Sequence, residues 1–109
     1  MSFGLSDDVL ARIQAIFAHF PVVERVLLYG SRAKGNYRTG SDIDLTFIGD
    51  GLDQRMLGLI AEELDELLLP YRFDLSIFSA ISHAELREHI ERVGMPFYEK
   101  KLVAREVNK

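Results

Sequence analysis

The sequence predicts an α/β (α+β) domain in which helices pack on one small mixed β-sheet. Segments with helical spacing of apolar residues alternate with short strand-like segments, and Gly or Pro residues separate them. The length of 109 residues allows one small domain, so we treat residues 1–109 as a single unit. The predicted order is helix, strand, helical turn, strand, helix, strand, helix.

The first half of the chain contains one helix and two strands. Residues 6–20 carry apolar side chains on one helical stripe, with Ser6 as a candidate N-cap and Pro21 as the stop. Residues 25–29 form a short apolar run that predicts a buried strand. Residues 30–41 read as a loop with a possible helical turn near Ala33. Residues 42–48 alternate between apolar and polar side chains, which is typical of a strand with one packed face.

The second half repeats this alternation. Residues 53–69 predict an amphipathic helix that Pro70 ends, and residues 71–78 predict an alternating strand. Ser82 and Glu85 form a capping box that opens a helix ending at Gly94. Residues 95–101 are a candidate edge strand, and we expect residues 102–109 to be a frayed tail.

Composition narrows the function classes. Hydrophobic residues make up 48% and charged residues 28% of the chain, which is typical of a globular protein. The absence of cysteine excludes disulfides, thiolate metal sites and a cysteine nucleophile. A net charge of −4 argues against direct nucleic-acid binding. Because no signal peptide or membrane-spanning run is visible, we expect a soluble cytoplasmic protein without a membrane partner.

The stretch from Gly30 to Leu45 holds the residues that indicate a chemistry. Gly30 and Ser31 follow a predicted strand, where a small residue lets a ligand approach backbone amides and a hydroxyl. Asp42 and Asp44 are two residues apart on the next strand, so both carboxylates project from one face, with Cα atoms about 6.5–7 Å apart. That separation favours a shared divalent cation, because two carboxylates repel each other unless a cation such as Mg²⁺ joins them to phosphate oxygens.

A third carboxylate lies on a later strand. Asp74 occupies the polar face of its strand and has apolar neighbours on both sides. If the two strands are neighbours in the sheet, Asp74 lies roughly 5 Å from the first pair. It could then hold a second metal and accept the proton of an incoming hydroxyl.

A chance origin of this pattern is the simplest alternative. Gly, Ser, Asp and Asp at these offsets match by chance at about one start position in 50,000. In that case the residues have no functional role, and Gly30 belongs to an ordinary turn followed by a strand whose polar face is exposed to solvent. A P-loop is excluded because Asn36 and Tyr37 stand where Lys and Ser or Thr are required, and no G-x-G-x-x-G is present.

The stretch resembles the G-S-x(10)-D-x-D signature of the nucleotidyltransferase superfamily that includes DNA polymerase β. More narrowly, it resembles the minimal nucleotidyltransferases (MNT), which are commonly paired with a HEPN-domain protein as a toxin–antitoxin system. Gly30, Ser31, Asp42 and Asp44 occupy the signature positions, and Asp74 matches the third carboxylate of the family. The motif itself matches over residues 30–45. Over most of the rest of the chain, the resemblance lies in the order of helices and strands. We see no counterpart of the helical domain with which longer relatives hold a nucleobase or a small acceptor.

The resemblance implies the polymerase β-like fold and an Mg²⁺-dependent protein adenylyltransferase. Such an enzyme transfers AMP from ATP to a hydroxyl, and the implied acceptor is a tyrosine of a HEPN partner toxin in a hetero-oligomer. The implied role of the chain is therefore that of an antitoxin.

The resemblance also implies roles for individual residues. Asp42, Asp44 and Asp74 are the implied metal ligands and catalytic carboxylates, and Asp74 activates the acceptor. The implied nucleotide-binding residues are Gly30 and Ser31, together with Arg32 and Lys34 as candidate sources of positive charge.

Two other functions are compatible with the sequence. The chain could neutralise its partner by binding and occlusion without catalysis. It could also adenylylate a small molecule such as an antibiotic, although no second domain is visible to form the acceptor pocket. The role of Tyr29 is open as well, since it either packs in the core or borders the nucleotide.

Overall fold

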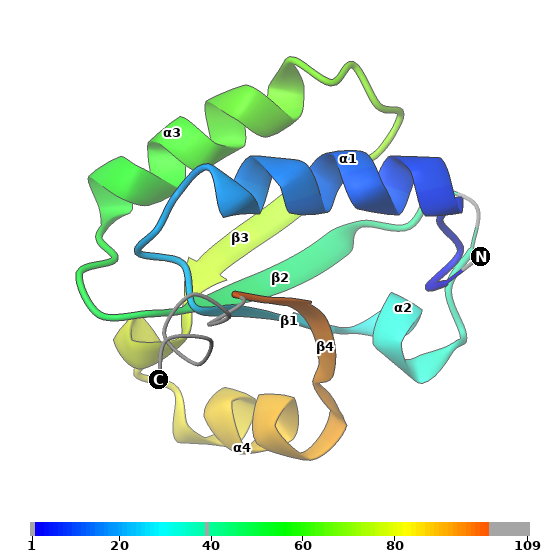
Figure 1. Cartoon of the computed structure of the whole chain (residues 1–109). Helices are drawn as coiled ribbons and strands as arrows, with labels where there is room; N and C mark the ends of the chain where they lie inside the picture. The colour runs from blue at the N-terminus through cyan, green and yellow to red at the C-terminus, as the bar shows by residue number, and fades with distance from the viewer. Residues whose placement is uncertain (1, 39, 101–109) are drawn as a thin grey trace, which may run out of the picture.

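Helices and strands alternate along the chain as the sequence predicts. The computed structural model describes residues 2–38 and 40–100 (Figure 1). In chain order the elements are α1 (Asp7–Ala18), β1 (Arg25–Tyr29), α2 (Ser31–Lys34), β2 (Ile43–Ile48), α3 (Gln54–Asp65), β3 (Phe73–Ile77), the 3₁₀ turn η1 (Phe78–Ala80), α4 (Ala84–Val93) and β4 (Met95–Glu99). The candidate edge strand is therefore present as β4. The predicted tail, residues 102–109, lies outside the described residues.

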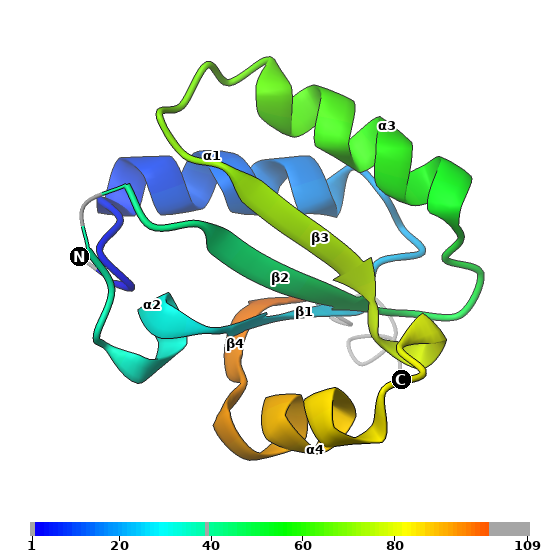
Figure 2. The same ribbon diagram turned by 180° about the vertical axis from the view of Figure 1, so that it is seen from behind.

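The four strands form one mixed sheet in the order β3-β2-β1-β4. β1 is antiparallel to β2 and to β4, whereas β2 and β3 are parallel. A parallel pair needs a crossover connection, and α3 supplies it. Helices α1 and α3 cover one face of the sheet and α4 lies on the other face (Figures 1 and 2). The predicted small mixed sheet with helices packed on it is confirmed.

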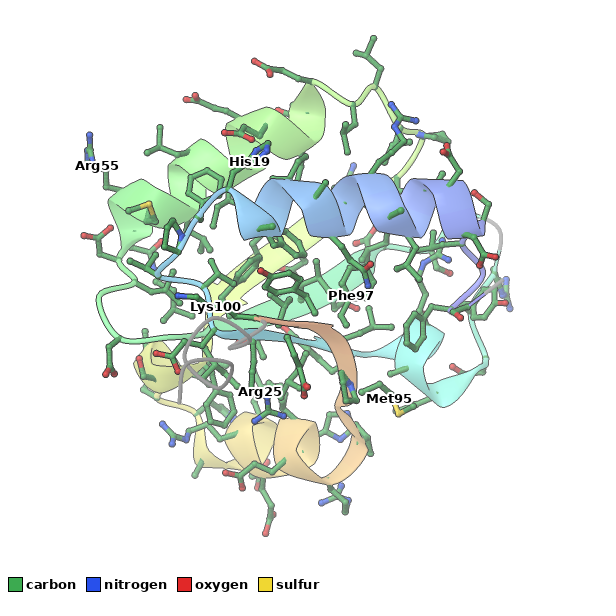
Figure 3. All side chains as sticks on the ribbon, viewed as in Figure 1. His19, Arg25, Arg55, Met95, Phe97 and Lys100 are labelled. Carbon is green, nitrogen blue, oxygen red and sulfur yellow. The ribbon has the colours of Figure 1, made fainter. Side chains whose placement is uncertain are left out.

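The hydrophobic core lies between the sheet and the layer formed by α1 and α3. The ring of Phe17 on α1 meets Phe47 of β2 edge to face, with ring centroids 5.2 Å apart. Phe97 of β4 points towards α1 and closes this cluster (Figure 3), its ring centroid 6.2 Å from that of Phe17. The alternating residues Ile43, Leu45 and Phe47 are fully buried on this face. The polar positions between them must therefore face α4.

Side chains cap the starts of α1, α3 and α4. The Ser6 hydroxyl accepts a hydrogen bond from the Val9 amide, and Asp53 caps α3 by accepting from the Met56 amide at 2.8 Å. The prediction for α4 was wrong by one residue, because His83 rather than Ser82 is the N-cap. The Nδ1 atom of His83 accepts from the Leu86 amide at 3.2 Å.

The end of α3 also differs from the prediction. The helix ends at Asp65 instead of reaching residue 69. Leu68 adopts a left-handed backbone with φ of 56°, and its amide bonds to the Asp65 carbonyl in a tightened last turn. A left-handed residue terminates a helix, and the position before Pro70 disfavours helical backbone. Leu68 is consequently 88% exposed.

No helix within residues 2–38 and 40–100 is both long enough and apolar enough to cross a membrane.

Candidate active site

Two of the predicted carboxylates lie side by side on the sheet face opposite α1 and α3. The parallel register pairs Asp44 of β2 with Asp74 of β3. Residues paired in register point to the same face from strands about 5 Å apart. The alternating sequence pattern predicted which face each residue occupies, and the register brings the two together. The condition set by the sequence, that these strands be neighbours, is met.

The bend formed by Gly30 and Ser31 lies against the row of carboxylates that Asp44 and Asp74 form across β2 and β3. Tyr29 pairs with Asp44 across β1 and β2, so Gly30 leaves β1 directly beside the Asp44 carboxylate. A Cβ atom built on Gly30 would collide with Oδ2 of Asp44 and would lie 3.2 Å from its Cγ. Gly30 also has φ of +83°, a conformation that side-chain-bearing residues rarely adopt. Glycine is therefore required here both by the close approach and by the backbone.

The surroundings of Asp44 disfavour its charge. Burial raises the pKa of Asp44 above its ordinary value, and the carboxylates of Asp74 and then Asp42 raise it further. Asp44 is half-buried, whereas Asp42 and Asp74 are exposed. The row therefore concentrates negative charge at a place that solvent and a ligand can reach.

The donor set fits a hard divalent cation. Carboxylate oxygens are the ligands that Mg²⁺ prefers, and a bound cation would relieve the repulsion that raises the Asp44 pKa. Across residues 2–38 and 40–100, however, no three His, Asp or Glu side chains are already gathered closely enough to hold a metal ion. The carboxylates thus match magnesium in chemistry, but the described residues do not form a closed cage for it.

Ser31 and Lys34 remain near the bend. Ser31 is half-buried and begins α2 directly after Gly30, while Lys34 ends α2 and is exposed. The position of Ser31 beside the Gly30–Asp44 contact is compatible with the predicted contact to phosphate. Lys34 could reach a ligand only by its flexible side chain.

Arg32 is buried and holds two distant segments of the chain together. It is only 3% exposed, and its guanidinium donates two hydrogen bonds to the Ser41 carbonyl, at 2.9 and 3.1 Å. A third donor bonds the Phe3 carbonyl at 2.8 Å. The rings of Tyr37 and Tyr71 lie 5.2 and 5.0 Å from the guanidinium carbon. Arg32 therefore anchors the loop before Asp42 through three of its five N–H groups.

Three hydroxyl groups near the carboxylates were not predicted as site residues. Burial raises the pKa of Tyr29, on which the neighbouring Ser76, Asp74 and Asp44 also act. The Ser76 hydroxyl donates a hydrogen bond to the Thr46 hydroxyl at 2.9 Å. Thr46 and Ser76 are themselves register partners. They occupy the next polar positions after Asp44 and Asp74, so the alternation that revealed the carboxylates contained the signal for the hydroxyls as well.

A groove of about 590 Å³ lies elsewhere, between α3 and the edge strand β3. It belongs to the face covered by the helical layer, and the carboxylate row does not line it. Its walls are formed by Gln54, Leu57, Gly58, Ala61, Leu64, Asp65, Tyr71, Arg72, Phe73 and Leu75.

Replacing Gly30 with Ala is expected to lower the free energy of unfolding by about 2–3 kcal/mol, measured by urea denaturation. The new methyl group would combine left-handed strain with displacement of the Asp44 carboxylate. Gly35→Ala is the matched control, since Gly35 has φ of +86° but nothing within 4 Å of a new Cβ. It should cost only the strain, about 1 kcal/mol. Equal losses in the two variants would show that Asp44 does not restrict position 30.

Comparisons with known proteins agree with this geometry. The family described as "Polymerase beta, Nucleotidyltransferase" matches residues 11–102. No curated protein matches the sequence. Among solved structures, a toxin–antitoxin complex with AMP-PNP superposes with a TM-score of 0.69 at 21% identity, covering 84% of this chain and 74% of that chain.

Two further solved structures share the fold. A single-site variant of the MntA–HpeT toxin–antitoxin complex has a TM-score of 0.66 at 20% identity, over 89% of this chain and 75% of that chain. The complex of a tri-AMPylated HEPN toxin with its MNT antitoxin from Shewanella oneidensis has a TM-score of 0.57 at 17% identity, over 92% and 74%.

Proposed function

The chain belongs to the polymerase β nucleotidyltransferase family, and we propose that it transfers AMP from ATP to a tyrosine hydroxyl of a HEPN-domain toxin and so acts as an antitoxin. The observation that carries this proposal is the row formed by Asp44 and Asp74, with the Gly30 bend closed against Asp44. Support for the acceptor comes from the structural neighbours, which include an MNT antitoxin in complex with its AMPylated HEPN toxin.

The phosphates would lie at the bend. Gly30 brings the bend into contact with the Asp44 carboxylate, and the Ser31 hydroxyl beside it would hold the β and γ phosphates of ATP. Asp42 and Asp44 would bind Mg²⁺, which supplies positive charge beside the triphosphate when it is bound. Lys34 would add a distant positive charge, whereas Arg32 would fix the loop that delivers Asp42.

The transfer of AMP requires no covalent bond between the protein and the nucleotide. The acceptor oxygen forms a bond to the α-phosphorus while the bond from that phosphorus to pyrophosphate breaks. The acceptor proton passes to a carboxylate, and we assign this role to Asp74, which is exposed on the edge strand and thus accessible to a second protein. Most of the rate acceleration then depends on how well these groups are placed.

The proposal is tested by incubating the chain with radiolabelled ATP, MgCl₂ and the product of the neighbouring gene, which we expect to be a HEPN-domain protein. We expect label on a tyrosine of the partner, identified by mass spectrometry. Label should be lost with the Asp42→Asn/Asp44→Asn variant, because its metal ligands are neutral. Asp50→Asn, in the turn after β2, makes the same chemical change away from the row and should label normally.

Other outcomes would contradict specific parts of the proposal. Undiminished labelling by the double variant would exclude the carboxylate mechanism. Full neutralisation of the toxin by the double variant, without label, would favour occlusion as the antitoxin mechanism. Labelling of a small molecule in place of the partner would identify a different acceptor class.

A further inference from the structure

The outer side of β3 is an unpaired edge of the sheet. Within the part of the chain that the structure describes, β3 pairs with β2 alone, and Figure 2 shows it as the outer strand of the sheet beneath α3. The Arg72 carbonyl accepts a hydrogen bond from the Ile43 amide of β2 at 2.9 Å. Because successive residues of a strand direct their backbone groups to opposite sides, the N–H and C=O groups of Phe73 and Leu75 point away from β2.

The two edges of the sheet differ in their protection. The other edge strand, β4, contains Pro96 and breaks its register with β1 between Val26 and Leu27. Proline and bulges are features by which proteins prevent a sheet edge from pairing with another chain. β3 contains no proline, and its five residues keep a regular register with β2. Of the two edges, β3 is therefore the one that can accept a further strand.

A strand added to β3 would have something to contact on both of its faces. On one face lies Asp74, the assigned proton acceptor, which is exposed. On the other face lies the groove of about 590 Å³, whose apolar lining includes Phe73 and Leu75 from β3 and Leu57 and Ala61 from α3. Because side chains alternate along a strand, one residue of the added strand would lie about 5 Å from Asp74 and its two neighbours would face the groove.

Charge indicates which kind of chain this edge accepts. The last turn of α3 carries Glu62, Glu63 and Asp65 without a basic residue, and Asp65 lines the groove. A second copy of this chain would pair β3 with β3 and place two Asp74 carboxylates on the same face of the strand pair, where like charges repel. A segment of another protein with a basic residue near Asp65 would instead be attracted.

We propose that the outer edge of β3 and the groove beside it form a docking surface for the segment of the partner protein that carries the acceptor hydroxyl. The segment binds in extended form as an added strand, so that main-chain hydrogen bonds supply affinity and alternate side chains supply selectivity. Its hydroxyl-bearing residue faces Asp74, the residues on either side are apolar and face the groove, and a basic residue lies near Asp65. This inference rests on the proposed function, because it takes Asp74 as the proton acceptor.

Gly58 offers a substitution that blocks the groove and spares the fold. It lines the groove from α3, and a Cβ atom added there would meet nothing within 4 Å. Trp and Ala are both better helix formers than Gly. Isothermal titration calorimetry with the product of the neighbouring gene, without nucleotide, should give a Kd about tenfold weaker for Gly58→Trp and within about twofold of the wild type for the control Gly58→Ala. Equal Kd values for the three proteins, or no binding by the wild type, would overturn the inference.

Amide hydrogen exchange distinguishes an added strand from other occupants of the groove. The outward amides of Phe73 and Leu75 should exchange rapidly in the free chain and at least about tenfold more slowly in the complex. The Asp74 amide faces β2 and should exchange slowly in both states. Binding that leaves the two outward amides unprotected would mean that a helix or a loop occupies the groove, contrary to the proposal. A dimer of the chain alone that Gly58→Trp dissociates, measured by sedimentation, would identify a second copy as the occupant and would also overturn it.

Steady-state kinetics separate the docking surface from the proposed function. Gly58→Trp should raise KM for the partner protein about tenfold and leave KM for ATP unchanged within about twofold, because the groove is not lined by the carboxylate row. A wild-type chain that protects its outward β3 amides on binding the partner but transfers no AMP would retain the docking surface and contradict the proposed function. Transfer by Gly58→Trp with an unchanged KM for the partner would retain the function and contradict the docking surface.

Discussion

An Asp44→Asn variant is expected to lose AMP transfer by on the order of 10³-fold while melting at a higher temperature than the wild type. The loss follows because Asp44 is at the centre of the row, paired with Asp74 and pressed against Gly30. The gain in stability follows because the environment of Asp44 in the folded protein disfavours its charged form, and asparagine carries no charge. Burial, and then the carboxylates of Asp74 and Asp42, raise the pKa of Asp44.

The pH dependence of this gain has a definite sign. A carboxyl whose pKa is higher in the folded than in the unfolded state favours folding when protonated and opposes it when charged. The cost is absent below the ordinary Asp pKa, grows as pH rises towards the folded-state value, and is fully present at neutral pH. Because solvent partly screens Asp44, we expect Asn to add only about 0.5–1 kcal/mol at pH 7, or a few degrees in Tm, and nothing in strong acid.

Calorimetry with and without MgCl₂ completes this test. Mg²⁺ should raise the Tm of the wild type, since a ligand that binds only the native state stabilises it, and should leave Asp44→Asn unaffected. Asp50→Asn should behave as the wild type in both respects. An Asp44→Asn protein less stable than the wild type at pH 7 would mean that the carboxylate stabilises the fold, contrary to the repulsion among the three aspartates.

The carboxylate row could be predicted because it depends on local patterns. Alternation along residues 42–48 and 71–78 assigned Asp44 and Asp74 to the polar faces of their strands, and strand period two leaves no other choice when the opposite residues are apolar. Register could not be predicted in the same way. A crossover helix joins β2 to β3, so no tight turn fixes which residue of β3 lies beside Asp44.

Other features depend on contacts between distant residues. The left-handed Leu68 that ends α3 early has no signal of its own in a run of three leucines. The hydrogen-bond partners of Arg32 could not be predicted from local sequence either, because Phe3 is 29 residues away and Ser41 is nine residues away. A basic residue beside a phosphate-binding signature suggests a phosphate ligand, and only the fold shows that three donors of Arg32 bond to backbone carbonyls.

Arg32→Met is accordingly expected to destabilise the fold more than Gly30→Ala does. Methionine approximates the aliphatic stem of arginine but supplies none of the three hydrogen bonds to the carbonyls of Ser41 and Phe3. Leaving these part-buried carbonyls without their donors, together with losing the cation over the Tyr37 and Tyr71 rings, should cost about 3–4 kcal/mol in urea denaturation. Lys34→Met, which makes a similar change on the exposed end of α2, should cost less than about 0.5 kcal/mol.

Arg32→Lys distinguishes the anchoring role from the phosphate role. A single ammonium cannot reproduce the forked contact with Ser41, so stability should still fall, by roughly half as much as in the Met variant. If Arg32 were a phosphate ligand, Lys would retain the charge, stability without nucleotide would be unchanged, and only ATP affinity would decline. If Arg32 anchors the loop, the stability of the protein without nucleotide falls in the Lys variant. Transfer then falls because the loop between the Gly30 bend and Asp42 no longer holds the two ends of the site together.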